Sequence, residues 1–326
     1  MRLFALNGSE ELGAAAASAL GVKIDPHEER DFEDGEHKTR PLVSVRGKDV
    51  YVLLSLAGGG GSSVNDRLCK LLFFLATCRE NGAARVTAVV PYLAYARKDR
   101  QTKARDPVTT RYVAKLFEAV GTDRIVTLDV HNFAAFQNAF RCESIHLDTR
   151  KLFVPIIRTL VGDHPVTVFS PDCGGVKRAQ LLKETFEALT GKDIGFGFME
   201  KRRSRGVVSG DIFAGDVTGS DVFIVDDMIG TGGTMLRAAL ACRERGANAI
   251  HAIAAHGVFG KGAKALFDSP AIDRIIVTDS VASAASAKAD YPSARLDILP
   301  AGSLIGEAVK RLHSHSSISD LLGIEN

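Results

Sequence analysis

Two adjacent carboxylates and a glycine-rich turn lie together in the stretch VFIVDDMIGTGGTML, residues 222–236. The run VFIV has the apolar, β-branched character of a buried strand, and Asp226 and Asp227 follow it directly. The turn after the acids combines glycines, which let backbone N–H groups come close to a ligand, with hydroxyl donors: Gly230, Thr231, Gly232, Gly233 and Thr234. A helix expected from Met235 onward directs its positive N-terminus at the same turn, which therefore predicts a phosphate-binding loop.

The two acids need a partner other than the phosphate, because carboxylates repel it. Sugar hydroxyls or a metal ion would suit them. A ribose phosphate satisfies both parts of the motif. Either Asp226 or Asp227 alone would also fit the simpler role of a helix-capping acid, but the run as a whole favours a sugar-phosphate site.

Short β-branched segments alternate with Ala/Leu-rich amphipathic segments along the chain. VYVLL is followed by VNDRLCKLLFFLATCRE, and VFIVDD is followed by GTMLRAALACRERG. This alternation predicts βαβ units and a parallel sheet with helices on both faces. Ligands of such sheets bind at the carboxyl ends of the strands, where we expect Asp226 and Asp227. Residues 2–6 are expected to form a strand, followed by a helix capped near Ser9.

Three segments of the first half recur in the second half in the same order. VRGKDVYVLLS (45–55) resembles VTGSDVFIVDD (217–227), RENGAARVTAV (79–89) resembles RERGANAIHAI (243–253), and DRIVTLD (123–129) resembles DRIIVTD (273–279). The offset between matched segments shrinks slowly along the chain, as it would in a duplicated domain whose loops have changed length. Strand–helix–strand units can share composition by chance, but three ordered matches favour the duplication. We predict domains at residues 1–147 and 148–302, with a terminal helix in 303–326 that can pack back on the first.

The duplication places LSLAGGGGS, residues 54–62, opposite DDMIGTGGT. Both copies keep glycines, but only the second keeps the paired acids and two of the threonines. The second copy is therefore predicted to carry the chemical site.

Composition excludes several classes of protein. The 326 residues are 45% hydrophobic and 25% charged, with 41 Lys and Arg against 39 Asp and Glu, so no charge excess favours a nucleic acid or a membrane surface. Five Cys without a C-x-x-C pair indicate neither a disulfide framework nor a structural zinc site, and they favour a reducing cytoplasm. Asn7, Glu10 and Glu11 interrupt the N-terminal apolar run, which argues against a signal peptide. The apolar run LLFFLA is too short to span a bilayer.

Four further stretches accompany the acidic loop: FEDGE (32–36), YARKDR (95–100), SPDCGGVKRA (170–179) and KRRSR (201–205). The acidic loop resembles the phosphoribosyl-diphosphate (PRPP) binding loop of type I phosphoribosyltransferases. All five stretches together, in order and over nearly the whole chain, resemble the ribose-phosphate diphosphokinase (PRPP synthetase) family. This resemblance implies an α/β fold of two tandem type I phosphoribosyltransferase-like domains, each a central, mostly parallel sheet flanked by helices. It also implies Mg²⁺-dependent transfer of the diphosphoryl group of ATP to the C1 hydroxyl of ribose 5-phosphate.

The resemblance assigns roles to individual residues. Lys201 and Arg203 match the family's catalytic loop, which closes over the transferring group; a solvated loop or a nucleic-acid patch is the alternative for these cations. His131 and Asp172 match its metal ligands. The residues that match its ATP site are Phe32, Asp34, Glu36, Arg97, Asp99, Arg100 and His131. The residues that match its ribose 5-phosphate loop are Asp226, Asp227, Gly230, Thr231, Gly232, Gly233 and Thr234.

The resemblance also implies a homo-oligomer, a dimer or a hexamer, because the family's adenine-binding turn, here FEDGE, reaches the nucleotide of a neighbouring subunit. The sequence contains no Walker loop G-x-x-x-x-G-K-[ST], so ATP must be bound in another way.

The chain departs from the family pattern in three places. Gly230 stands where the family's loop usually has a third Asp, and Lys98 replaces the usual Gln after Arg97. After His131, NFAAFQNAF replaces A-[DS]-Q-I-Q-G-F-F. These departures indicate a divergent subgroup.

Two other functions compete with the synthetase. A catalytically silent, nucleotide-binding regulatory paralogue would have little reason to keep both Lys201 and Arg203. A phosphoribosyltransferase acting on a nucleobase would not need FEDGE, YARKDR or the duplicated half. A nucleic-acid-binding role has only KRRSR in its favour.

Overall fold

The computed structural model describes residues 1–161, 164–204, 207–290 and 295–323, and it describes only the backbone of 201–204, 207–211 and 288–290. The chain divides into two compact units. The N-terminal unit contains Met1–Asp148, Ser280–Ala282 and Pro300–Asn326, and the C-terminal unit contains Thr149–Asp279 and Ser283–Leu299.

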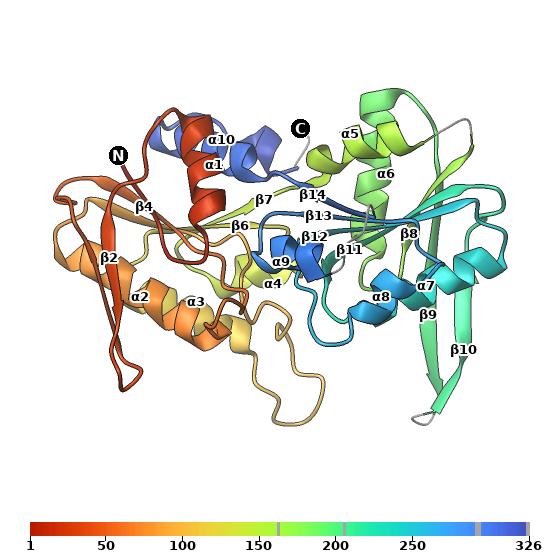
Figure 1. The fold of residues 1–326 in the computed structure, drawn as a ribbon, viewed down its shortest axis with the longest axis horizontal. Coiled ribbons are helices and arrows are strands. Elements are labelled where there is room, and N and C mark those ends of the chain that lie inside the picture. Colours follow the sequence, from red (N-terminus) through yellow and green to blue (C-terminus); the bar gives the residue numbers. More distant parts are fainter. Residues whose placement is uncertain (162–163, 205–206, 291–294, 324–326) are drawn as a thin grey trace. The chain divides into compact units, whose positions relative to one another are not determined.

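The N-terminal unit is built on a five-stranded parallel sheet with strand order β1-β4-β5-β6-β7. Strands β4, β6 and β7 of this sheet are labelled in Figure 1. A separate antiparallel hairpin, β2–β3, packs against α2. The elements of this unit are β1 (Arg2–Ala5), α1 (Glu10–Leu20), β2 (His27–Asp31), β3 (His37–Pro41), β4 (Asp49–Leu53), α2 (Val64–Glu80), β5 (Arg85–Val89), α3 (Thr109–Ala119), β6 (Arg124–Leu128), α4 (Phe133–Ala139), β7 (Glu143–Leu147), α10 (Gly302–His313) and the 3-10 turn Ser319–Leu321.

The C-terminal unit is built on a seven-stranded sheet with strand order β10-β9-β8-β11-β12-β13-β14. Its described strands pair in parallel, except for β9 with β10, which are antiparallel. Its elements are α5 (Arg150–Leu160), β8 (Val166–Ser170), α6 (Val176–Thr190), β9 (Gly195–Ser204), β10 (Val207–Ala214), β11 (Asp221–Ile229), α7 (Gly233–Glu244), β12 (Ala249–Gly257), α8 (Lys264–Asp268), β13 (Arg274–Thr278), α9 (Ser283–Asp290) and β14 (Leu296–Leu299).

Strand β11 is buried on both faces, as a central strand of a parallel sheet must be. Val222 and Ile224 face a core formed with α7, α8 and α9, whereas Phe223 and Val225 face a second core formed with α5 and α6. The β-branched run VFIV therefore suits this strand, because each side chain finds an apolar layer on its own side. The predicted fold class, a mostly parallel sheet flanked by helices in each half, is confirmed.

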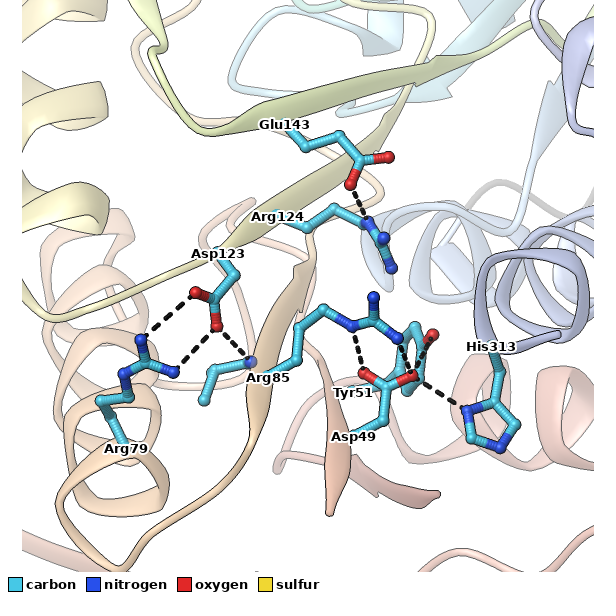
Figure 2. A network of polar contacts seen from close by, with 9 residues as sticks. Asp49, Tyr51, Arg79, Arg85, Asp123, Arg124, Glu143 and His313 are labelled. Carbon is cyan, nitrogen blue, oxygen red and sulfur yellow. Dashed lines mark hydrogen bonds and ion pairs between the residues drawn. The ribbon is translucent and has the colours of Figure 1, made fainter. Parts of the chain in front are cut away.

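The same five-strand core occurs in both units. Strands β1, β4, β5, β6 and β7 correspond in order to β8, β11, β12, β13 and β14. One polar contact also occurs at equivalent places in the two units. Arg79 forms an ion pair with Asp123, which also accepts a hydrogen bond at 2.8 Å from the N–H of the second residue of β5 (Figure 2). In the C-terminal unit Arg243 pairs with Asp273, which accepts at 2.6 Å from the N–H of the second residue of β12, the strand equivalent to β5.

A second polar cluster at the amino ends of the N-terminal strands surrounds Asp49. Figure 2 shows Arg85, Tyr51 and His313 converging on this carboxylate, with contacts of 2.9, 3.0 and 2.9 Å. Burial acts to raise the pKa of Asp49, but the hydrogen bonds from Arg85, His313 and Tyr51 outweigh it and the pKa is lowered. Because His313 ends α10, this contact joins the last helix to the sheet of its own unit.

Helix α10 packs closely along α1. A Cβ added to Gly302 would lie 2.5 Å from the Cβ of Ala15, and one added to Gly306 would lie 2.6 Å from the carbonyl oxygen of Ala16. The two glycines therefore allow the helix backbones to approach each other. Ser9 is the N-cap residue of α1, as predicted, but its hydroxyl accepts a hydrogen bond from the N–H of Ser55 at 2.9 Å and does not cap the helix.

Within the described residues, the helices are all too short or too polar to cross a lipid bilayer.

Candidate functional site

The paired acids lie where β11 loses one of its neighbours. Strand β11 pairs with β8 only as far as Ile224, whereas its pairing with β12 continues to Ile229. The sequence predicted that the acids lie at the carboxyl end of this strand, and β11 ends two residues after Asp227, at Ile229. Asp226 and Asp227 are strand residues, and their backbone is held on one side only, at the carboxyl end of the sheet where ligands of such folds bind.

The side chains of the paired acids are largely buried and close to one guanidinium. They are 20% and 5% exposed, and Nη1 of Arg178 lies 3.5 Å from Asp226 and 3.7 Å from Asp227. Burial and the neighbouring carboxylate of Asp227 raise the pKa of Asp226 to about 8, against the opposing effect of Arg178. Asp226 also accepts a hydrogen bond at Oδ1 from the N–H of Asp227 at 2.8 Å. Sugar hydroxyls would add hydrogen-bond donors to this pair of acids.

Arg178 was not among the site residues predicted from the sequence. It lies in the first turn of α6, within the motif SPDCGGVKRA, and the motif gave no sign that this helix packs against β11. The only signal was its place in the first turn of a helix that follows a glycine pair. Its proximity to two acids on a strand much later in the sequence is a tertiary contact.

The glycine loop leads from β11 into α7. Gly232 has a φ of +75° in the left-handed region, and an added Cβ would lie 2.9 Å from the Cβ of Leu266. Only glycine meets both conditions easily. Gly230, by contrast, has open space around the position of an added Cβ, and its carbonyl accepts from the N–H of Gly260 at 3.0 Å.

Among the described residues, no side chain caps the N-terminus of α7. The first N–H groups of a helix have no partner within the helix, and together with the helix dipole they attract anions. Thr231 is exposed and Thr234 half-buried in this loop. The combination suits a phosphate group, as the sequence indicated.

The equivalent loop of the N-terminal unit is closed by its own side chains. Ser63 and Asp66 form a capping box at the start of α2, with hydrogen bonds of 2.7 and 3.2 Å. The guanidinium of Arg67, buried at 5% exposure, donates to the carbonyls of Ser55 and Gly59 at 3.2 and 3.1 Å. The N-terminal loop is therefore capped and bound by side chains of its own, whereas in the described C-terminal loop no side chain caps α7.

Asp172 lies in the loop between β8 and α6. Its Oδ1 accepts from the N–H of Gly175 at 3.0 Å, and its carbonyl accepts from the hydroxyl of Ser170 at 2.7 Å. The loop is thus ordered by its own hydrogen bonds at the carboxyl end of β8. A carboxylate fixed in this way is a suitable oxygen ligand for Mg²⁺.

The FEDGE stretch forms the exposed turn of the β2–β3 hairpin. The N–H of Phe32 donates to the carbonyl of Glu36 at 2.8 Å, and Asp34 accepts from the N–H of Glu36 at 3.1 Å. The ring of Phe32 is 41% exposed, and Arg30 lies over it at 5.0 Å. The hairpin is held to α2 by an ion pair between Lys70 and Asp31 at 2.7 Å.

The YARKDR stretch and His131 approach each other in the N-terminal unit. Arg97, Arg100 and His131 are exposed. Asp99 is half-buried, and its Oδ2 accepts a hydrogen bond at 2.6 Å from the side-chain amide of Asn132, the residue after His131. The expected ATP segment and the expected metal-binding His are therefore joined by one short contact.

The KRRSR stretch was predicted to be a loop. Instead, residues 201–204 extend β9 and pair with β10, with Lys201 opposite Asp211 and Arg203 opposite Val208. Residue 205 and the side chains of Lys201 and Arg203 lie outside the part of the chain that is described, so their catalytic role stays a prediction.

Within the described residues, no three His, Cys, Asp or Glu side chains cluster closely enough to form a metal site on their own. His131 belongs to the N-terminal unit and Asp172 to the C-terminal unit. The carboxylate of Asp172 is an oxygen donor of the kind that Mg²⁺ takes alongside water or phosphate.

Comparison with known proteins identifies the family. Residues 1–121 match the N-terminal domain of ribose phosphate pyrophosphokinase, and residues 210–323 match the phosphoribosyl synthetase-associated domain. The ribose-phosphate pyrophosphokinase of Vibrio parahaemolyticus is 36% identical over 321 residues, which cover 98% of each chain. That of Hyphomonas neptunium is 33% identical over 322 residues, covering 98% of this chain and 99% of its own.

The chain belongs to the ribose-phosphate pyrophosphokinase family. The crystal structure of phosphoribosylpyrophosphate synthetase from Mycobacterium smegmatis matches it with a TM-score of 0.84 and 30% identity, covering 97% of this chain and 99% of that one. The predicted family, fold and enzyme class are thereby confirmed. Both halves of the duplicated fold are part of what the family shares, since the match extends over the whole chain.

Proposed function

We propose that this protein is a ribose-phosphate pyrophosphokinase that transfers the diphosphoryl group of ATP to the C1 hydroxyl of ribose 5-phosphate, giving PRPP and AMP. The observation that carries the proposal is the C-terminal loop, in which two largely buried acids adjoin a helix N-terminus that no described side chain caps. Full-length similarity to enzymes of this name supports the same reaction.

In the proposed site, Asp226 and Asp227 accept hydrogen bonds from the ribose hydroxyls. The N-terminus of α7, with Thr231, Thr234 and the three loop glycines, binds the 5-phosphate. A hydrogen bond from a ribose hydroxyl would replace one that the carboxylate would form with water. This replacement offsets part of the free-energy cost of burying the acid. Arg178 limits the repulsion between the two acids before the sugar arrives.

ATP is proposed to bind the N-terminal unit. Arg97 and Arg100 would contact its phosphates as exposed cations, and Asp99 would orient the segment that bears them. Phe32 would stack on the adenine of a neighbouring subunit's nucleotide, with Asp34 and Glu36 accepting from the exocyclic amine. A homo-oligomer, a dimer or a hexamer, is part of this proposal.

Mg²⁺ would be held by His131 and Asp172 together with the phosphates of ATP, and it would neutralise charge on the transferring group. Lys201 and Arg203 would add positive charge to the same group during transfer. Neither role requires a covalent intermediate, because transfer between two bound substrates depends on alignment and charge neutralisation. A cytoplasmic location and the absence of nucleic-acid substrates complete the proposal.

The test is AMP release from ATP, Mg²⁺ and ribose 5-phosphate by purified, folded protein. AMP should appear only when all three are present, and equal amounts of PRPP should form. Folded protein that binds ATP but releases no AMP would favour the catalytically silent paralogue. PRPP consumption with a nucleobase and without ATP would favour a phosphoribosyltransferase.

Lys201→Ala should lower kcat by two orders of magnitude or more, because one cation facing the transition state is lost. The KM for ribose 5-phosphate should change by less than threefold, since the sugar loop is untouched. Lys192→Ala, an exposed lysine on the loop before β9, is the matched control and should leave kcat unchanged. Turnover by Lys201→Ala equal to that of the control would remove Lys201 from the mechanism.

A further inference from the structure

We propose that Asn132 is a positioning residue that holds the ATP segment against the His131 turn. This proposal rests on the proposed function for the identity of the nucleotide, but it stands on a contact in the N-terminal unit alone. The side-chain amide of Asn132 donates to Oδ2 of Asp99 at 2.6 Å, between segments that are far apart in the sequence.

Both the nitrogen and the oxygen of the Asn132 side-chain amide form hydrogen bonds. While its nitrogen donates to Asp99, its Oδ1 accepts from the N–H of Ala135 at 3.1 Å and thereby caps α4. An Asn whose donor and acceptor are both engaged has one orientation only. The residue before it, His131, shares its backbone, so the position of the His131 turn depends on this side chain.

The other end of the contact lies between two cations. Asp99 is half-buried, whereas Arg97 and Arg100 on either side of it are exposed. The backbone before Asp99 is also constrained, because Tyr95 has a φ of +63° and its carbonyl accepts from the N–H of Lys98 at 3.1 Å. The backbone is thus constrained at Tyr95 and again at Asp99, which restricts the conformations available to Arg97 between them.

A hydrogen bond between an amide and a carboxylate is stronger than one between neutral groups, and at 2.6 Å this one is short. Its physical effect is to order the cationic segment before the nucleotide binds. Less conformational entropy is then lost on binding, so affinity for the nucleotide rises without any new contact to it.

The contact also connects two places where this chain departs from the family pattern. Lys98 adjoins Asp99, and Asn132 begins the altered stretch NFAAFQNAF.

The experiment exchanges the two partners. Asn132→Asp keeps an acceptor for the N–H of Ala135, so α4 keeps its cap, but it places two carboxylates against each other at the contact. Asp99→Asn combined with Asn132→Asp restores an amide–carboxylate pair in the reverse direction. Both single variants and the double variant are compared with the wild-type protein for ATP dissociation constant by calorimetry, in the presence of Mg²⁺, and for melting temperature.

We expect Asn132→Asp to weaken ATP binding by about tenfold, the scale of one charge-assisted hydrogen bond. Ribose 5-phosphate binding should change by less than twofold. In the Asp99→Asn background, Asn132→Asp should leave ATP affinity unchanged or should increase it. Asn132→Ser, which can cap α4 but is too short to reach Asp99, should weaken ATP binding to a similar extent and provides the test if Asn132→Asp fails to fold.

The proposal is overturned if Asn132→Asp leaves ATP affinity within twofold of wild type. It is also overturned if the loss is the same with Asp and with Asn at position 99, or if ATP and ribose 5-phosphate weaken equally. These outcomes are separate from the fate of the proposed function. A wild-type protein that binds ATP and releases no AMP would refute catalysis and still allow the contact to be tested by binding.

Discussion

Asp226 is expected to lower the free energy of unfolding of the ligand-free protein when its side chain is ionised. Its side chain is largely buried next to Asp227, and the pKa of Asp226 is raised to about 8. Between about pH 4 and pH 8 the folded chain therefore holds a proton that the unfolded chain has lost. Stability falls with rising pH wherever the folded state binds more protons, so wild-type protein loses stability across this window and levels off above it.

Asp226→Asn removes this loss because an amide does not ionise. A rise from 3.8 to about 8 is about four pKa units, and each unit corresponds to about 1.4 kcal/mol, which sets an upper limit near 6 kcal/mol. Solvent reaches the exposed fifth of the side chain and reduces the effect. We expect the variant to be more stable than wild type by about 1–3 kcal/mol at pH 9.

The assay is urea unfolding of ligand-free protein at pH 5, 7 and 9. The stability gained by Asp226→Asn should be smallest at pH 5 and largest at pH 9. Asp34→Asn, in the exposed turn, controls for the loss of one carboxylate and should change stability little. At pH 9, where Asp226 is ionised, the same Asp226→Asn protein should bind ribose 5-phosphate at least tenfold more weakly, since a charged acceptor is lost.

A variant less stable than wild type at pH 9 would refute this reasoning, as would a gain that is equal at pH 5 and pH 9. Either result would mean that Asp226 is ionised at little cost in the free protein. Arg178 would then be a full counter-ion and not a partial one.

Asp123→Ala and Asp273→Ala remove equivalent contacts in the two units, each an ion pair plus an acceptor for a backbone N–H. Each should lower the free energy of unfolding by about 1–3 kcal/mol, as measured by urea titration, and a difference above about 2 kcal/mol between them would contradict the equivalence. Gly232→Ala should cost about 2–4 kcal/mol because of its positive φ and its approach to Leu266, whereas Gly230→Ala should change stability by less than about 1 kcal/mol. Equal melting temperatures for the two glycine variants would show that the loop adapts to a side chain.

The local features of this protein could be read from the sequence. Alternation of β-branched and amphipathic segments predicted the α/β fold, because strands buried on both faces require apolar runs such as VFIV. Three ordered matches with shrinking offsets predicted the duplication, and the ion pairs of Arg79 and Arg243, which begin the second matched pair of segments, repeat it in the structure. The paired acids and the glycine loop were predicted for the same reason: their chemistry depends on residues adjacent in the chain.

Contacts between distant segments were decided only by the tertiary structure. Arg178 lies beside the paired acids because α6 packs on β11, and Arg67 fills the N-terminal loop because α2 directs it toward carbonyls on two other segments. KRRSR has the composition of a loop, yet residues 201–204 extend a strand because β10 supplies a partner. Composition and periodicity act over a few residues along the chain. Contacts between distant side chains depend on how whole helices and strands pack against one another. The sequence determines this packing only through the combined effect of all the elements.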